Sequence, residues 1–313
     1  MASIICGVDV SSEWLDAQVR AGSGEFCRFE NSNDGIEALR AFCRKNEVGL
    51  VVMEATGGYE RLAFGLLWAA GVPCAIVNPR SVRRFAEAMG LLEKTDRIDA
   101  GAIAWYAEAK KITARPPADP AQQKLTALVT RLRQLTELRT MQANQRRLVT
   151  DADTHRSIGD LLAFIARQIR VLERAVVDLI GCDPLWQKLN EAFRTTKGVA
   201  SRTVARILAE MPEIGTLSNK AAAKLTGVAP LANDSGKRQG KRPVRGGRSG
   251  VRSILFVVAE VVRRHDPDFA AFHKKLSQAG KPKKVIRIAL ARKLIVRLNA
   301  KARDTRAQLA LLA

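Results

Sequence analysis

The sequence predicts an α/β domain at the N-terminus followed by a long all-α region. Short apolar runs alternate with helical patterns from residue 1 to about residue 112, as expected for an α/β domain. A proline-rich segment, residues 114–120, then interrupts the alternation. Beyond it, leucine and isoleucine recur at steps of three and four residues through two long segments, which is the spacing of packed helices.

The first domain, residues 1–114, opens with three predicted strands. The first is the apolar run Ile4–Val10, and the next two are residues 15–20 and 26–30, separated by a glycine-containing turn. Helices at 33–46, 59–70 and 81–89 then alternate with strands at 50–54 and 73–77. Three meandering strands followed by βαβ alternation is the element order of an RNase H-like fold, and plain doubly wound folds lack the opening meander.

The second part, residues 115–190, contains the linker and a predicted antiparallel helical hairpin. Its two seams follow a heptad pattern, typical of a coiled coil. The seam residues are Leu125, Leu128, Leu132 and Leu135 on the first helix, and Ile158, Leu162, Ile165, Ile169, Leu172, Val176 and Leu179 on the second. Use of the seam inside the hairpin and use in dimerisation remain equally open.

The third part, residues 191–313, is predicted to be mainly helical, with helices at 248–264 and 283–312. Residues 196–205 resemble a helix-hairpin-helix turn, in which Lys197 and backbone N–H groups would face a DNA phosphate. A plain glycine-capped junction between two helices fits these residues equally well.

The composition points to a nucleic-acid partner. The 313 residues include 52 lysines and arginines against 31 acidic residues, a net charge of +21. Five scattered cysteines and three histidines match no metal-binding spacing, so reduced cysteines are expected. Without a signal-peptide pattern or a long apolar stretch, a cytoplasmic protein with no membrane partner is expected.

Four carboxylates are the candidate metal ligands and catalytic residues: Asp9, Glu54, Asp96 and Asp99. Asp9 lies within an apolar run, Glu54 ends another, and Asp96 and Asp99 project from one face of a helix start. A buried carboxylate is costly unless something neutralises it, and Mg²⁺ prefers oxygen ligands. The quartet therefore predicts Mg²⁺-dependent phosphodiester chemistry.

Each carboxylate also has a structural interpretation. Asp96 would cap its helix, Asp99 would favour the helix dipole, and Glu54 would pair with Arg61. Asp9 has the weakest such explanation, because an Asp between Val8 and Val10 has no cap to make. The functional interpretation is preferred because it accounts for all four residues together.

Residues 233–248 form a second candidate site, expected to be a flexible basic loop. Ten of these residues are glycine or basic, and Ser235 is the hydroxyl at its core. Ser235 is either a nucleophile assisted by neighbouring cations or a simple turn cap, and chemistry alone favours the cap. The candidate nucleic-acid-binding residues are Lys197, Lys237, Arg238, Lys241, Arg242, Arg245, Arg248 and Arg252.

These motifs resemble the DEDD transposases of bacterial insertion sequences, the family usually called IS-one-ten, over nearly the whole chain. The N-terminal motifs are Gly7-Val8-Asp9-Val10-Ser11, Met53-Glu54-Ala55-Thr56-Gly57 and Lys94-Thr95-Asp96-Arg97-Ile98-Asp99-Ala100. The C-terminal motifs are Gly227-Val228-Ala229-Pro230, Asp234-Ser235-Gly236 and Gly247-Arg248 leading to Val251-Arg252.

The resemblance implies a RuvC-like N-terminal domain that binds Mg²⁺ through the acidic quartet. It also implies a C-terminal transposase domain in which Ser235 forms a covalent phosphoserine link to DNA, reversing the preference for a turn cap. Members of the family are guided by a structured non-coding "bridge" RNA and act as homo-oligomers, dimers or tetramers, on donor and target DNA.

The sequence therefore predicts a site-specific DNA recombinase that inserts and excises its own element. One alternative is a Holliday-junction-type endonuclease, in which the quartet activates water. A second is a catalytically silent nucleic-acid-binding protein, against which the complete quartet argues.

Overall fold

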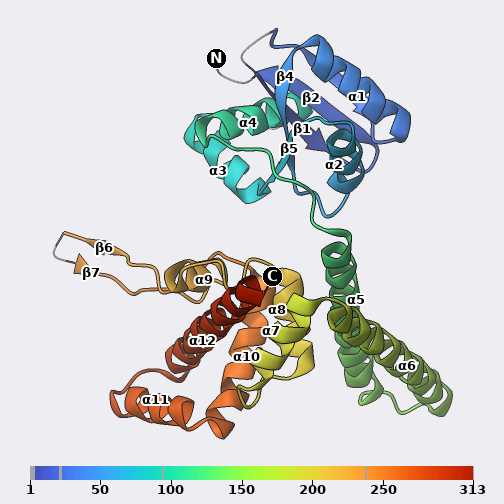
Figure 1. The fold of residues 1–313 in the computed structure, drawn as a ribbon. Helices are drawn as coiled ribbons and strands as arrows, with labels where there is room; N and C mark the ends of the chain where they lie inside the picture. The colour runs from blue at the N-terminus through green and yellow to red at the C-terminus, as the bar shows by residue number, and fades with distance from the viewer. Residues whose placement is uncertain (1–3, 21–22, 94, 237, 313) are drawn as a thin grey trace. The chain divides into compact units, whose positions relative to one another are not determined.

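The computed structural model describes residues 4–20, 23–93, 95–236 and 238–312. It divides into two compact units, residues 1–118 and 119–313, and each is described by itself (Figure 1). Lys237, a predicted nucleic-acid-binding residue, lies outside the described residues. The three-part division expected from the sequence stays a prediction.

The first unit is built on a five-stranded sheet in the order β3-β2-β1-β4-β5. Its strands are β1 (Ile4–Val10), β2 (Trp14–Arg20), β3 (Phe26–Glu30), β4 (Val48–Glu54) and β5 (Cys74–Val77). The first three strands pair antiparallel, and β4 and β5 continue the sheet in parallel with β1. This meander followed by parallel strands confirms the element order expected of an RNase H-like domain.

Helices cover both faces of this sheet (Figure 1). They are α1 (Asn33–Lys45), α2 (Glu60–Ala69), α3 (Pro79–Ala88) and α4 (Asp96–Ala109). One face packs its apolar residues against α1 and α2, and the other packs against α3 and α4. Because successive strand residues point to opposite faces, each strand contributes to both cores. The face covered by α4 carries Asp9 and Glu54, and Asp96 and Asp99 lie on α4 itself.

The second unit begins with two long helices, α5 (Pro120–Arg146) and α6 (Ala152–Cys182). They pack against each other as a hairpin, with Leu135, Ile165 and Ile169 buried between them. These three residues belong to the predicted heptad seams. Use of the seam by a second copy of the chain, and a supercoiled geometry, remain predictions.

The rest of the second unit is a helical bundle around α12. Its helices are α7 (Pro184–Arg194), α8 (Ser201–Glu210), α9 (Asn219–Leu225), α10 (Ser249–His265), α11 (Pro267–Gln278) and α12 (Lys283–Leu312). Leu290, Leu294 and Leu298 place one side of α12 in the core. Among the described residues, none of these helices combines the length and apolar character needed to cross a bilayer.

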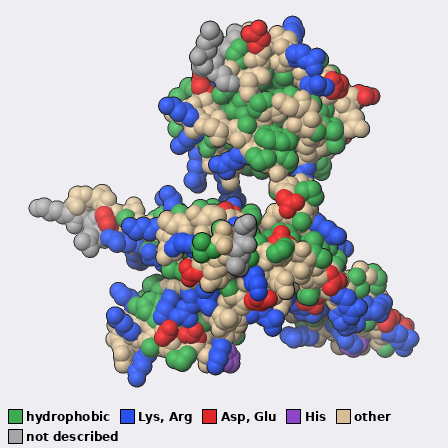
Figure 2. Space-filling view, viewed as in Figure 1, with side chains coloured by type: hydrophobic (Ala, Val, Ile, Leu, Met, Phe, Trp, Pro, Cys, Tyr) green, Lys and Arg blue, Asp and Glu red, His purple; other side chains and the backbone are tan. Residues whose placement is uncertain are grey.

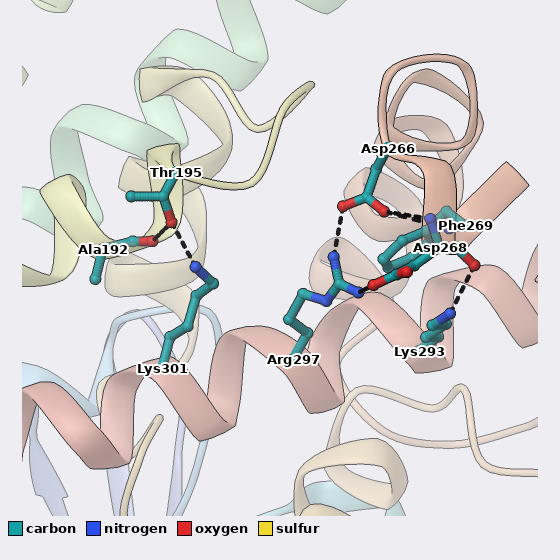
Figure 3. Close-up of polar contacts among 8 residues, drawn as sticks. All are labelled: Ala192, Thr195, Asp266, Asp268, Phe269, Lys293, Arg297 and Lys301. Atoms are coloured by element: carbon teal, nitrogen blue, oxygen red, sulfur yellow. Dashed lines mark hydrogen bonds and ion pairs between the residues drawn. The ribbon is translucent and has the colours of Figure 1, made fainter.

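Polar contacts fix α12 against its neighbours (Figure 3). Arg297 forms ion pairs with Asp266 and Asp268 at the start of α11, and Lys293 donates to the Asp268 carbonyl oxygen at 2.8 Å. Lys301 donates to the Thr195 hydroxyl just after α7. Several of the basic residues of this cationic helix therefore hold the bundle together.

The basic segment expected to be a flexible loop contains a short antiparallel hairpin, β6 (Asp234–Ser235) and β7 (Arg238–Gln239). It projects from the bundle beside α9 (Figure 1). Gly236 has a φ of +54° after β6, a conformation that glycine adopts without the strain of a Cβ atom. Ser235 is therefore placed by strand pairing.

Candidate functional site

Asp9 and Glu54 lie at the carboxyl ends of two neighbouring parallel strands. The register pairs Val8 of β1 with Met53 of β4, so Asp9 and Glu54 are the next residues along both strands. Both point to the face that packs against α3 and α4, since the residues at alternating positions on β1 and β4 do so. The sheet thus brings two of the four predicted carboxylates to one edge of the domain.

The loop after Glu54 is shaped by a buried carboxylate that sequence reasoning did not select. Glu60, near the start of α2, accepts hydrogen bonds from the backbone N–H groups of Thr56 at 3.1 Å and Gly58 at 2.9 Å. Two donors thus satisfy the Glu60 carboxylate in the turn that joins β4 to α2. The signal in the sequence was the two adjacent glycines before the helix, which indicate a tight turn.

Helix α4 brings Asp96 and Asp99 to the same face. Thr95 is the N-cap and accepts from the Ile98 N–H at 3.3 Å, so the interpretation of Asp96 as the cap is wrong. Asp96 and Asp99 both lie in the first turn of the helix. The helix packs directly on β1 and β2 because Gly7 has no side chain to hold it off.

The pKa of Asp9 is raised to about 6. Burial is the largest cause, followed by the negative charges of Asp99 and then Asp96. A hydrogen bond from the Val10 backbone lowers it, and Asp16 raises it slightly. Burial and the charges of two other predicted carboxylates therefore both disfavour the ionised form of Asp9.

A further carboxylate, Asp16, belongs to this cluster and was missed in the sequence. It lies on β2 directly opposite Asp9 and is only 5% exposed. The signal was present in the strand alternation: Leu15, Ala17 and Val19 form the apolar face, which leaves Asp16 on the other face. That other face is the one covered by α4.

Arg28 on β3 neutralises part of the cluster. Its Nε donates to Asp16 Oδ1 at 2.8 Å and one terminal nitrogen donates to Asp16 Oδ2 at 3.1 Å. The same terminal nitrogen donates to the Asp96 carboxylate. These partners, Asp16 first, raise the pKa of Arg28 above its ordinary value. One guanidinium therefore joins β2 to the start of α4.

The carboxylates fit a divalent cation in chemistry and in charge. They supply hard oxygen donors, and the raised pKa of Asp9 marks a point where positive charge is favoured. Within the described part of the chain, however, no three Asp, Glu, His or Cys side chains are arranged to hold a metal as they stand. In this arrangement Asp96 is paired with Arg28.

The second candidate site lies on the β6–β7 hairpin. Ser235 is exposed and pairs with Arg238, whose side chain is outside the description. Asp234 accepts from the Gly240 N–H at 3.2 Å and from Arg242 at 2.9 Å. Asp234 thus ties both arms of the hairpin together beside the serine.

The remaining predicted nucleic-acid-binding residues fall into two groups. Arg248 donates to the Glu210 carbonyl oxygen at 2.8 Å and pairs with Glu213, and Arg252 donates to the Gly246 carbonyl oxygen at 2.8 Å. These two arginines hold the base of the hairpin. The exposed group is Lys197, Lys241, Arg242 and Arg245. Figure 2 shows Lys and Arg side chains spread over the visible face of the second unit.

Lys197 lies in the turn between α7 and α8, well separated in sequence from the basic segment. Gly198, beside it, has a φ of +96°, and an added Cβ atom would lie 3.0 Å from the backbone nitrogen of Val262. The glycine thus permits close packing of this turn on α10. A DNA contact by this turn stays a prediction.

Two family models match the chain. One, described as a transposase of the DEDD IS110 type, matches residues 6–151, and the other, described as the transposase IS116/IS110/IS902 family, matches residues 190–274. The first model spans Asp9, Glu54, Asp96 and Asp99, and the second spans Ser235.

Full-length relatives and partial structural neighbours were also found. Pilin gene-inverting proteins of Moraxella bovis and Moraxella lacunata are each 29% identical over 326 residues, covering 98% of this chain and 98% of each relative. The Thermus thermophilus RuvC in complex with a Holliday junction substrate matches 37% of this chain and 100% of its own, at 18% identity and a TM-score of 0.29.

Proposed function

Since the chain belongs to the IS116/IS110/IS902 family of transposases and is a DNA transposase/recombinase, we propose that it is a site-specific recombinase that inserts and excises its own element. The relatives of similar length carry a name that describes inversion of a gene, which is also a cut-and-rejoin reaction on DNA. The net charge of +21 supports a polyanionic substrate.

The observation that carries the proposal is the acidic cluster under α4. Asp9, Asp96 and Asp99 share one face, and burial together with the negative charges of Asp99 and Asp96 raises the pKa of Asp9 to about 6. We propose that these residues and Glu54 hold Mg²⁺. When bound, the cation neutralises negative charge on the scissile phosphate and its leaving oxygen. The sheet positions Asp9 and Glu54, and Thr95 fixes the start of the helix that carries the other two.

The proposed nucleophile is Ser235. Its Oγ would lose its proton and bond to phosphorus as one P–O bond of the DNA backbone breaks, and the departing oxygen would gain one proton in return. The product is a phosphoserine link to one DNA end and a free hydroxyl on the other, so the step can be reversed by that hydroxyl. Support comes from the exposure of Ser235 on a paired strand and from the exposed cations Lys241, Arg242 and Arg245.

We also propose that a structured guide RNA and at least one further copy of the chain take part. The support is the family resemblance, together with the exposed basic residues other than Arg248 and Arg252, the two arginines that hold the base of the hairpin. Exposed apolar residues on α6, among them Phe164 and Val171, are available to a second copy.

The decisive experiment compares wild type, Ser235→Ala and Asp9→Asn with element-junction DNA, guide RNA and Mg²⁺. Wild type should form a protein–DNA adduct that survives denaturation, and both variants should lose it. Arg133→Gln, which removes an exposed charge on α5, is the matched control and should retain the adduct.

The alternative, a Holliday-junction-type endonuclease using water, is favoured by one observation: the acidic cluster and its counter-ion are complete within the first unit. That enzyme would cut DNA equally with and without Ser235, and no adduct would form. Cleavage by Ser235→Ala at the wild-type rate would therefore replace the proposed mechanism with this one.

A further inference from the structure

Arg28 links two carboxylates that differ in their freedom to move. Asp16 lies on β2 with 6% of its side chain exposed, whereas the side chain of Asp96 on α4 is 61% exposed. Arg28 binds both oxygens of Asp16 and one oxygen of Asp96. The contact with Asp16 is therefore the fixed one, and the contact with Asp96 is the exchangeable one.

The sheet register builds this arrangement. Asp9 pairs with Asp16 across β1 and β2, and Asp16 pairs with Arg28 across β2 and β3. Residues directly opposite each other share a face, so all three side chains lie in one row beneath α4. The guanidinium also lies 5.7 Å from the centre of the Trp14 ring. Arg28 thus keeps two neighbours on β2 if Asp96 leaves it.

We propose that Arg28 is a positioning residue that holds Asp96 in the metal-free protein and sets the affinity of the acidic site for divalent cations. This inference rests on the proposed metal-binding role of Asp9, Glu54, Asp96 and Asp99. When a cation binds, Asp96 exchanges Arg28 for the cation, and Asp16 retains Arg28.

The direction of the effect follows from charge. A guanidinium on Asp96 competes for one ligand and repels a dication from the others. Loss of Arg28 should therefore strengthen cation binding while it weakens the metal-free fold, because buried Asp16 loses its partner. An arginine with a purely structural role would, when removed, weaken cation binding or leave it unchanged.

The test is a Mn²⁺ titration of the full chain without DNA, in which electron paramagnetic resonance measures free Mn²⁺. Arg28→Gln should tighten the dissociation constant by about tenfold, the order expected for removal of one nearby positive charge. Arg28→Lys keeps the charge, but its single ammonium cannot span both carboxylates, so a tightening of about threefold is expected. Arg40→Gln removes a charge from α1, where it pairs with Glu37, and should leave the affinity unchanged.

The outcomes separate this inference from the proposed function. Unchanged or weakened Mn²⁺ binding in Arg28→Gln overturns the inference, and if that variant does not fold, the same result in Arg28→Lys does so. Wild-type binding that survives Asp9→Asn overturns the proposed metal site itself. Binding lost in Asp9→Asn but unaltered in both Arg28 variants leaves the metal site standing and removes only the role of Arg28.

Discussion

Gly7 of β1 and Ala100 of α4 are in direct backbone contact. A Cβ atom built on Gly7 would lie 2.1 Å from the Ala100 carbonyl oxygen and 2.6 Å from the Ala104 nitrogen. No side chain fits there unless the helix moves, because both neighbours are backbone atoms. The helix that carries Asp96 and Asp99 therefore contacts β1 at Gly7. This residue is two positions before Asp9 and lies on the same face of the strand.

Gly7→Ala is therefore expected to lower the free energy of unfolding by about 1–3 kcal/mol, the usual cost of overpacking. It should also weaken Mn²⁺ binding, since α4 is displaced from Asp9. Gly65→Ala is the matched control: nothing lies within 4 Å of its added Cβ, and alanine in the helix should stabilise by about 1 kcal/mol. Equal effects of the two changes in urea unfolding would contradict this account.

The raised pKa of Asp9 makes a prediction about pH. An acid whose pKa is higher when folded, about 6 here against 3.8, binds more protons in the folded state between those values. Its contribution to stability therefore falls as pH rises from about 4 through about 6, and the full penalty remains at neutral pH. Asp9→Asn should thus exceed wild type in stability at pH 7.5, with the difference shrinking toward pH 4. A difference that does not vary with pH would refute the assigned pKa.

Asp234 is predicted to support Ser235 through the hairpin. Asp234→Ala removes the acceptor for the Gly240 N–H and the partner of Arg242, so β6 and β7 lose a link beside the serine. Adduct formation should fall severalfold, while the melting temperature of the chain should stay near wild type because the hairpin is exposed. Glu191→Ala, which removes a surface pair with Lys188, is the control. A wild-type yield of adduct in Asp234→Ala would contradict the supporting role of Asp234.

Asn299 is predicted to be a buried polar residue that stabilises the docking of α12. It is fully buried, accepts from the Gly215 N–H at 2.9 Å and donates to the Leu217 carbonyl oxygen at 2.9 Å. Asn299→Asp keeps the shape but removes the donor and buries a charge, so a loss of about 2–3 kcal/mol is expected. Gln145→Glu makes the same chemical change at an exposed site and should be nearly neutral in thermal unfolding.

The sequence predicted the architecture of the first unit because its strands are apolar and evenly punctuated. The run around Cys6 and Val8, and the later run ending at Glu54, are short and apolar, so they were predicted as buried strands, and the opening meander indicated the element order. Spacing also gave the hairpin of α5 and α6, because leucine and isoleucine repeat cleanly along both helices.

What the sequence did not disclose depends on contacts between distant segments. Arg28 and Asp16 are 12 residues apart in the sequence. Their contact with Asp96 depends on the register of three strands and on where α4 packs against the sheet. Thr95 precedes two aspartates that are equally good caps, so local preference alone could not select it. The β6–β7 hairpin was missed because two residues per strand give no readable alternation.

The pairing of Ser235 with Arg238 has a consequence for how the chain can change over time. Ordinary surface connections gain and lose residues freely, whereas a shift of one residue in a paired strand turns each side chain to the opposite face. A single insertion between Asp234 and Ser235 would reverse the direction of the hydroxyl while leaving its chemistry intact. Relatives that retain the serine are therefore expected to retain the length of the segment from Asp234 to Gly240 as strictly as the serine itself.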